Sequence, residues 1–107
     1  MAIKRVWHGW TTKGDAECYQ KILLETVIPG IEAKKMPGYL GIEVLREEQE
    51  EEVEFVTMMT FETLEQIKAF QGEDYTKSYV PQAAQKVLKR WDQTSTHYET
   101  IDARTYE

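Results

Sequence analysis

The chain has two histidines, His8 and His97, and they are its candidates for acid–base chemistry. Imidazole is the only side chain whose unperturbed pKa lets it gain or lose a proton near neutral pH, so either residue could act as a catalytic base. Glu99 follows His97 by two positions, a spacing that puts both side chains on the same side of a strand. The alternative, which we take as the default, is that each histidine is a partly buried strand residue bonded to backbone or to a nearby carboxylate.

Aromatic residues are the candidates for holding a substrate. Tyr75 or Tyr79 could position a phenolic ring, and the full set of candidates is Trp10, Phe70, Tyr75 and Tyr79. Trp7, Trp10 and Trp91 could also form an aromatic cradle, although such residues more often belong to a core. Because Trp7 and Trp10 are three positions apart, they should point to opposite faces of a strand. We expect one to pack under helices and the other to lie near a subunit interface.

Other chemistries find little support. His8, His97 and Glu99 have side chains that bind metals, but they come from different predicted strands and their spacing is not diagnostic, so we expect no metal. Cys18 is the only cysteine, which excludes a disulfide within the chain, and we interpret it as a packing residue. Phosphate loops, nucleotide fingerprints, CxxC pairs and nucleophile elbows are absent, and we expect no cofactor.

The first half of the chain predicts a strand, a helix and a second strand. Ile3–Trp10 is short and rich in large and β-branched residues, which is typical of a strand. Thr12 and Asp15 resemble a capping box for a helix that should end or kink at Pro29-Gly30. Its apolar face is predicted to comprise Ala16, Tyr19, Ile22, Leu23 and Val27. Tyr39–Arg46 alternates like a strand, with Leu40, Ile42 and Val44 on one face and Tyr39, Gly41 and Glu43 on the other.

The second half predicts strand, helix and strand again. Residues 47–52 are almost all glutamate, and we interpret them as a solvated hairpin tip rather than an acidic binding patch. Val53–Phe61 is a strand that is apolar on both faces. Thr63 and Gln66 predict a capped helix that Gly72 ends. A further helix is predicted from Pro81 to Trp91, with a short turn before it at 74–79 and a last strand at 94–101.

This order of elements is the βαββαβ pattern of an α+β, ferredoxin-like domain that spans residues 1–107. Right-handed crossovers would place the helices on one face of a four-stranded antiparallel sheet and leave the other face bare. The apolar Val56 and Met58 should lie on that bare face, so we expect a homodimer that packs sheet against sheet. The alternative is that both residues are merely tolerated at the surface.

Composition excludes several classes of partner. The net charge is −6, whereas nucleic acids and anionic membranes require clustered positive charge, so we expect neither as a partner. The sequence has no apolar run long enough to cross a bilayer and no visible secretory signal. We therefore expect a cytoplasmic protein.

Five short motifs carry a family resemblance that covers roughly residues 3–101. They are Trp7-His8-Gly9-Trp10-Thr11, Pro37-Gly38-Tyr39, Phe61-Glu62-Thr63-Leu64, Phe70-Gln71-Gly72-Glu73-Asp74 and His97-Tyr98-Glu99. Together they make the chain similar to the antibiotic biosynthesis monooxygenase family of dimeric α+β barrels. The resemblance implies a ferredoxin-like subunit, a homodimer with facing sheets, and a ligand pocket between the sheet and the helices of each subunit. Some members oxidise aromatic polyketides with molecular oxygen and without metal or flavin, and others degrade haem.

The haem-degrading branch does not fit this sequence. Its members resemble one another in an asparagine on the first strand, a tryptophan near the end of the second helix, and a histidine shortly after it. Here the first strand has no asparagine, Phe70 takes the tryptophan position, and residues 74–80 contain no histidine. The resemblance instead implies a cofactor-independent monooxygenase that acts on a small aromatic or quinol-like molecule. The alternatives are haem binding without degradation, or a non-catalytic homodimer that binds a small molecule or is purely structural.

Overall fold

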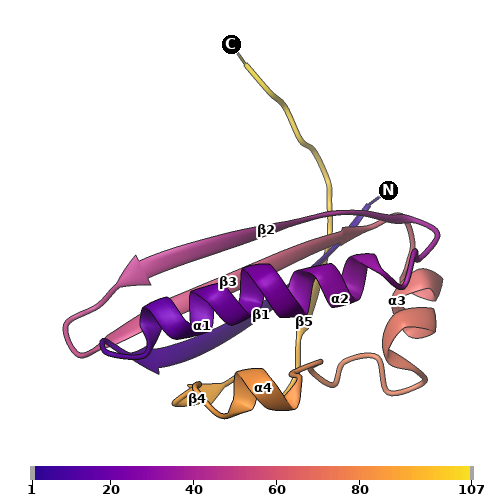
Figure 1. The fold of residues 1–107 in the computed structure, drawn as a ribbon. Helices are drawn as coiled ribbons and strands as arrows, with labels where there is room; N and C mark the ends of the chain where they lie inside the picture. Colours follow the sequence, from indigo (N-terminus) through magenta and orange to yellow (C-terminus); the bar gives the residue numbers. More distant parts are fainter. Residues whose placement is uncertain (1, 107) are drawn as a thin grey trace.

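The sheet is built on β1 (Ile3–Thr12), which pairs antiparallel with β3 (Glu52–Phe61), and β3 pairs antiparallel with β2 (Tyr39–Glu48). Two short strands, β4 (Arg90–Trp91) and β5 (Thr96–Glu99), share the other edge of β1 (Figure 1). The structure is a computed structural model that describes residues 2–106.

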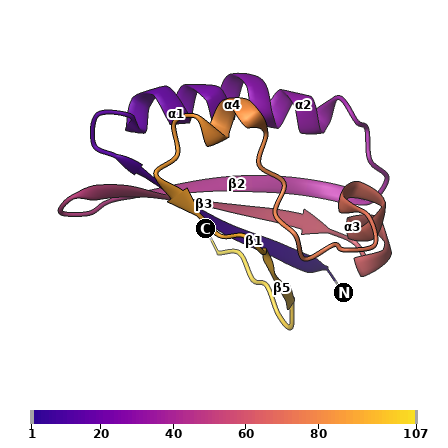
Figure 2. The same ribbon diagram turned by 90° about the horizontal axis from the view of Figure 1, so that it is seen from below.

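The helices cover one face of this sheet (Figure 2). They are α1 (Ala16–Ile22), a π-helical segment (Leu23–Val27), α2 (Ile28–Glu32), α3 (Leu64–Gln71) and the short α4 (Gln82–Gln85). The predicted α+β, ferredoxin-like fold is therefore confirmed, with one difference. The predicted last strand, at 94–101, forms as β5, and the short β4 is added from residues expected to be helical, which makes five strands in residues 2–106.

Strict alternation along β1 and β3 decides which side chains meet the helices. Every second residue of each strand is buried, and these inward residues are Arg5, Trp7, Gly9 and Thr11 of β1 and Val53, Phe55, Thr57, Met59 and Phe61 of β3. They pack against Tyr19, Leu23 and Ile31 on one side and Ile67 of α3 on the other to form the core. The residues in between, such as His8, Val56 and Met58, face the opposite side of the sheet, as a period of two requires. We call this side the outer face.

The two faces of β2 differ from the predicted pattern at its beginning. A register shift between Tyr39 and Gly41 lets Tyr39 pair with Phe61 while Ile42 pairs with Met59. Tyr39 therefore shares the inner face with Ile42 and Val44, and Leu40 is 57% exposed. The prediction that Leu40 shares a face with Ile42 and Val44 was wrong, because one irregular residue reverses the alternation before it.

The first helix continues through Pro29 instead of ending there. A proline cannot donate a hydrogen bond, so a regular helix would lose one bond at this position. The chain widens into a π-helical turn just before it, where the Ile28 N–H donates to the Leu23 carbonyl, and then resumes as α2. At the start of α1, the Asp15 N–H donates to Thr12 Oγ1 at 3.2 Å, which is half of the predicted reciprocal capping box.

The capping box of the second helix is confirmed. The Thr63 N–H donates to Gln66 Oε1 at 3.0 Å, and Ile67 on the inner side of α3 is fully buried. Gly38, at the start of β2, has a φ of +76°, and a Cβ there would overlap the Gln66 side chain. The turn before β2 thus needs a glycine both for its conformation and for the close approach of α3.

The predicted helix from Pro81 to Trp91 is much shorter than expected. Helical structure ends at Gln85, and Trp91 belongs to β4, where it pairs with Gly9. No helical turn forms at 74–79 either, although the Lys77 N–H donates to the Asp74 carbonyl in a simple turn. The physical reason is tertiary: the chain around residue 90 gains a strand partner on β1, which the helical spacing of its apolar residues does not reveal.

Residues 92–95 separate β4 from β5, and several of their hydrogen bonds go to groups other than the backbone of β1. The Asp92 carboxylate accepts the His8 N–H at 3.1 Å, in place of a backbone carbonyl. The Ser95 N–H donates to Thr76, and the Ser78 N–H donates to Gln93, so this stretch pairs with the loop that follows α3. That loop is thereby held against the edge of the sheet.

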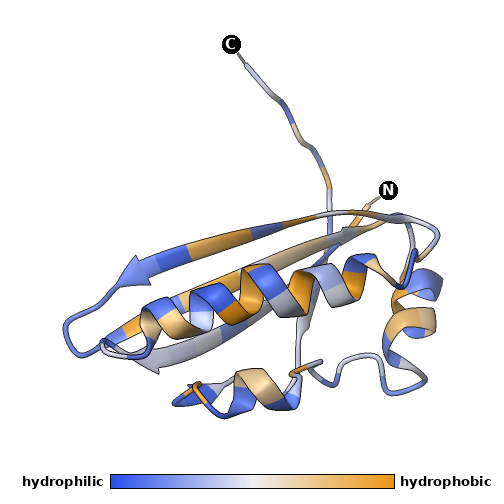
Figure 3. Cartoon of the chain, viewed as in Figure 1, coloured by the Kyte–Doolittle hydropathy of each residue, from blue (hydrophilic) through white to orange (hydrophobic). Residues whose placement is uncertain are grey.

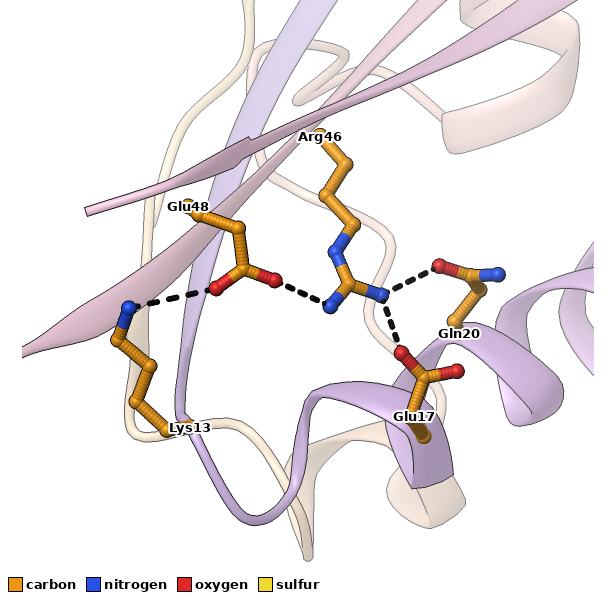
Figure 4. Close-up of polar contacts among 5 residues, drawn as sticks. All are labelled: Lys13, Glu17, Gln20, Arg46 and Glu48. Carbon is orange, nitrogen blue, oxygen red and sulfur yellow. Dashed lines mark hydrogen bonds and ion pairs between the residues drawn. The ribbon is translucent and has the colours of Figure 1, made fainter.

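The acidic stretch forms a hairpin turn between β2 and β3, as predicted, with the Gln49 N–H bonded to the Glu52 carbonyl. It is the hydrophilic tip in Figure 3. Beside it, Arg46 joins β2 to α1: Nη1 lies 2.8 Å from both Glu17 Oε1 and Gln20 Oε1, and Nη2 lies 2.6 Å from Glu48 Oε1 (Figure 4). These contacts are largely exposed, so each contributes little to stability.

None of the helices in residues 2–106 has both the length and the apolar character that crossing a bilayer requires.

Candidate functional site

A cavity lies between the inner face of the sheet and the helices, where the resemblance implied a ligand pocket. It offers about 40 Å³ to the centres of water molecules. Its walls are apolar for the most part, and its lining includes Trp7, Tyr19, Phe70 and Tyr79 among the aromatics and Leu23, Val27, Ile31 and Val80 among the aliphatics. The polar contributions come from Arg5, Thr57 and Ser95. A few polar groups in an apolar enclosure are typical of a small-molecule site.

Among residues 2–106, Arg5 is the only charged residue in the wall of this cavity, and it is 3% exposed. It reaches the cavity because it is the second inward position of β1, between Ile3 and Trp7. Nη1 donates to the Tyr75 carbonyl and to His97 Nε2 at 2.8 Å, and Nη2 donates to the Lys77 carbonyl at 2.8 Å. Burial lowers the pKa of Arg5 to about 10, and at neutral pH the guanidinium remains a cation.

His97 lies opposite Arg5 in the pairing of β5 with β1 and therefore also faces the helices. A guanidinium can only donate, so Nε2 of His97 must accept and the ring proton must lie on Nδ1. Burial and the Arg5 charge lower the pKa of His97, which is consistent with a neutral ring. The imidazole packs edge-on against Tyr75 with ring centres 5.2 Å apart and does not line the cavity. By accepting a hydrogen bond from Nη1, His97 helps to hold the Arg5 guanidinium in place.

His8 lies on the outer face of the sheet. Its Nδ1 is 2.7 Å from Asp92 Oδ2, and its ring stacks on Trp10 with centres 6.0 Å apart. The Arg90 guanidinium lies over the Trp10 ring, with Cζ 3.9 Å from the ring centre. His8 is thus bonded to a neighbouring carboxylate, the alternative considered for it from the sequence.

The structure does not bring the two histidines together. His8 and Arg5 are three residues apart on β1 and so point to opposite faces, and His97 lies with Arg5. His8 and His97 therefore lie on opposite faces of the sheet, although β1 and β5 are neighbouring strands. Within residues 2–106, no group of three or more His, Cys, Asp or Glu side chains is arranged to hold a metal ion.

The aromatic candidates divide in two. Phe70 and Tyr79 line the cavity and contact each other edge-on, with ring centres 5.3 Å apart. Tyr75 and Trp10 do not line it: Tyr75 packs on His97, and Trp10 lies on the outer face. As predicted, Trp7 and Trp10 point to opposite sides, with Trp7 buried under the helices.

Arg5 was missed in the sequence, although a signal for it was present. Alternate residues of the predicted strand lie on one face, and one such set is Ile3, Arg5, Trp7 and Gly9. Trp7 was expected to face either the helices or an interface. A basic residue two positions before a core tryptophan on a strand lies on the same face, which indicates a buried cation. Thr57 could have been found in the same way, because it is a polar residue among the inward residues of β3. Ser95 could not, because it lies between β4 and β5 and its N–H bonds to Thr76.

Comparison with known proteins supports the fold. No protein-family model matches the sequence, and no curated protein matches it significantly. Among solved structures, putative antibiotic biosynthesis monooxygenases from Bacillus cereus and Nitrosomonas europaea superpose with TM-scores of 0.68 and 0.65, at 14% and 10% identity. The first match covers 100% of this chain and 98% of the other, and the second covers 94% and 90%.

A third structure, an ethyl tert-butyl ether D family protein from Bacillus halodurans, has a TM-score of 0.58 at 17% identity and covers 94% of this chain and 100% of the other. One fold thus serves proteins with different names, and a fold by itself does not assign a reaction. At these identities the matches establish architecture: this chain has the ferredoxin-like α+β fold that structures named as antibiotic biosynthesis monooxygenases share.

Proposed function

We propose that the protein is an antibiotic biosynthesis monooxygenase-like enzyme that binds a small aromatic or quinol-like molecule in the cavity and oxygenates it with molecular oxygen, without a cofactor. The observation that carries the proposal is the apolar cavity between sheet and helices, walled by Trp7, Phe70 and Tyr79 and containing the single cation Arg5. The likeness in fold to structures named for this activity supports it as well.

The chemistry requires an electron-rich substrate, a means of forming its anion, and exclusion of water. The aromatic and aliphatic walls meet the last requirement, because few polar groups line the cavity to hold water. A buried guanidinium stabilises a negative oxygen placed beside it, which favours ionisation of a phenol or enol. Neither His8 nor His97 lines the cavity, so neither is assigned the role of base.

The cavity also bears on the size of the substrate. Space of about 40 Å³ for water centres holds a few water molecules. A substrate larger than a single ring would therefore require the side chains of the helices or of the loop after α3 to move.

Oxygen uptake tests the proposal. Purified protein, treated with a metal chelator and free of flavin absorbance, should consume oxygen when supplied with hydroquinones or small phenols, and product should retain an oxygen atom from labelled dioxygen. Thr57→Leu, which fills the cavity, should reduce the rate by about tenfold or more because the substrate loses its space. Thr60→Leu makes the same change on the outer face of the same strand and should leave the rate near that of the wild type.

A non-catalytic protein that binds a small molecule is the second candidate. It is favoured by the small volume of the cavity and by the absence of both histidines from its lining. Saturable binding of quinols with no oxygen uptake above the protein-free rate would select this function over the oxygenase.

We also propose that two copies associate through their outer faces. Val6 of β1, Val56 and Met58 of β3, and Leu45 of β2 lie on this face, and Leu45 is 46% exposed. Contiguous apolar side chains on an uncovered sheet favour association with a matching surface, and a second copy supplies one by two-fold symmetry.

A further inference from the structure

Arg5 is a buried cation without an anionic partner in the described chain. Its three bonds go to two backbone carbonyls and to a neutral imidazole, and no carboxylate of residues 2–106 forms an ion pair with it. A buried charge is expensive unless it is paired, because the protein interior replaces water poorly. The two carbonyl dipoles and His97 offset part of the cost of burying the charge. None of them carries a negative charge that would neutralise it.

The guanidinium retains hydrogen-bonding capacity. It has five N–H donors, of which the three bonds above use three, so two remain for a ligand. Because Arg5 also lines the cavity, a ligand inside could accept from them. Phe70 lies beside the same group, with its ring centre 5.7 Å from Arg5 Cζ, and provides an aromatic wall next to the charge.

The charge on the lining of the cavity is positive, although the chain carries a net charge of −6. No aspartate or glutamate of residues 2–106 lines the cavity. Lys34, in the turn after α2, lies 6.0 Å from the centre of the Phe70 ring and 5.7 Å from that of Tyr79, both of which are lining residues. A second cation therefore lies near two of the aromatic lining residues, which favours a ligand that carries negative charge.

We infer that the ligand of this cavity carries an oxyanion on a small aromatic framework, a carboxylate or a phenolate, and that Arg5 binds this oxygen with its remaining N–H donors while Phe70 and Tyr79 contact the ring. The inference rests on the proposed site but not on its oxygenase activity. It deepens the proposed function by stating the charge of the molecule that the cavity takes. His97 is a positioning residue for Arg5 in this arrangement.

Two matched probes test the inference on the wild-type protein. Benzoate and benzamide have nearly the same shape and differ in charge, and titration calorimetry should show benzoate binding about tenfold tighter or more. The second probe, 4-nitrophenol, absorbs differently as a phenol and as a phenolate. At a pH where it is mostly neutral in solution, adding protein should increase the phenolate band. Neither probe needs to react with oxygen, so a failure of the oxygenase proposal would not affect these results.

Variants assign the effect to Arg5. Arg5→Met should bring the affinities for benzoate and benzamide to about the same value and abolish the phenolate signal, whereas Arg5→Lys should retain part of both. Lys4→Met removes the same charge from the adjacent residue on the outer face, where Lys4 bonds to Thr60, and should behave like the wild type. Circular dichroism and thermal unfolding show whether each variant is folded.

The wild-type measurement decides the matter even if Arg5→Met does not fold. Equal affinity for benzoate and benzamide, or no saturable binding of benzoate and no phenolate signal, would overturn the inference and leave Arg5 as a structural support for the loop at 75–77. A preference for benzoate that survives in a folded Arg5→Met variant would overturn the assignment to Arg5.

Discussion

Arg5 and His97 are two ionisable side chains joined by one hydrogen bond, and this bond depends on the charge state of the imidazole. Strand pairing sets them opposite each other, one donates and the other accepts, and the ring is thereby kept neutral. Protonation of His97 would remove the acceptor and place two positive charges in contact, which is unfavourable in a partly buried setting. The pair therefore couples the position of the cavity cation to the charge state of one imidazole.

This coupling predicts a pH dependence of stability. The pKa of His97 in the folded protein lies below its ordinary value, through burial first and the Arg5 charge second. In the unfolded chain it returns to about 6.5, so below that pH the unfolded state takes up the proton more readily. The stability contributed by a neutral His97 is present above about pH 6.5 and is lost as the pH falls through the folded pKa.

His97→Gln tests this dependence, since glutamine can accept from Arg5 but does not titrate. Urea unfolding measured from pH 7.5 to about pH 5 should show a smaller loss of stability in the variant than in the wild type. His8→Gln removes the other histidine without touching Arg5 and serves as the matched control. Identical slopes in wild type and His97→Gln would contradict the proposed neutral state.

At the scale of elements, β1 organises the molecule, because every other strand except β2 pairs with it directly. Its inward row alternates large and small residues: Trp7 is followed by Gly9, and the indole lies over that glycine. A Cβ on Gly9 would lie 2.5 Å from Trp7 Cη2 and 3.0 Å from Leu88 Cδ2. The absence of a side chain at position 9 thus allows Trp7 and Leu88 to pack closely against the backbone of β1.

Gly9→Ala should therefore destabilise the protein by about 1–3 kcal/mol, because the added methyl group overpacks the core. Gly41→Ala is the matched control: it lies in β2, its Cβ would meet no atom within 4 Å, and its stability should stay close to that of the wild type. The free energy of unfolding in urea measures both. A Gly9→Ala variant as stable as Gly41→Ala would show that Trp7 moves at little cost.

At the scale of the whole molecule, the sheet has two unequal faces. One is covered by helices, while the other carries Val6, Val56 and Met58 in its centre, and no helix of residues 2–106 covers it (Figure 2). His8 and Trp10 lie on the same outer face, towards the far end of β1. If copies pair through this face, these two candidate site residues belong to the interface instead of the cavity.

Val56→Glu should convert the proposed dimer to a monomer, because it buries a charge without a partner at the centre of the interface. Sedimentation velocity measures the change directly. Ala83→Glu introduces the same group on an exposed position of α4 and should leave the mass of the assembly unchanged. A wild-type protein that sediments as a monomer at all concentrations would contradict the proposed association.

The elements of this fold could be predicted from sequence where their signals are local. Alternation in Val53–Phe61, the capping residues Thr63 and Gln66, and the acidic turn each depend on neighbours a few residues away, and each is confirmed. Predictions failed where a distant partner intervened: Trp91 pairs with β1 despite its helical spacing, and a register shift reverses Leu40.

The candidate site follows the same division. Sequence alone determined the order of the elements, the one-sided placement of the helices and the opposite facing of Trp7 and Trp10, because chain direction and strand periodicity suffice for these. Only the tertiary structure decided that His8 and His97 lie on opposite faces and that Arg5 stands in the cavity without a carboxylate. The pairing of Arg5 with His97 and the bond from the His8 N–H to Asp92 are contacts between residues more than 80 positions apart.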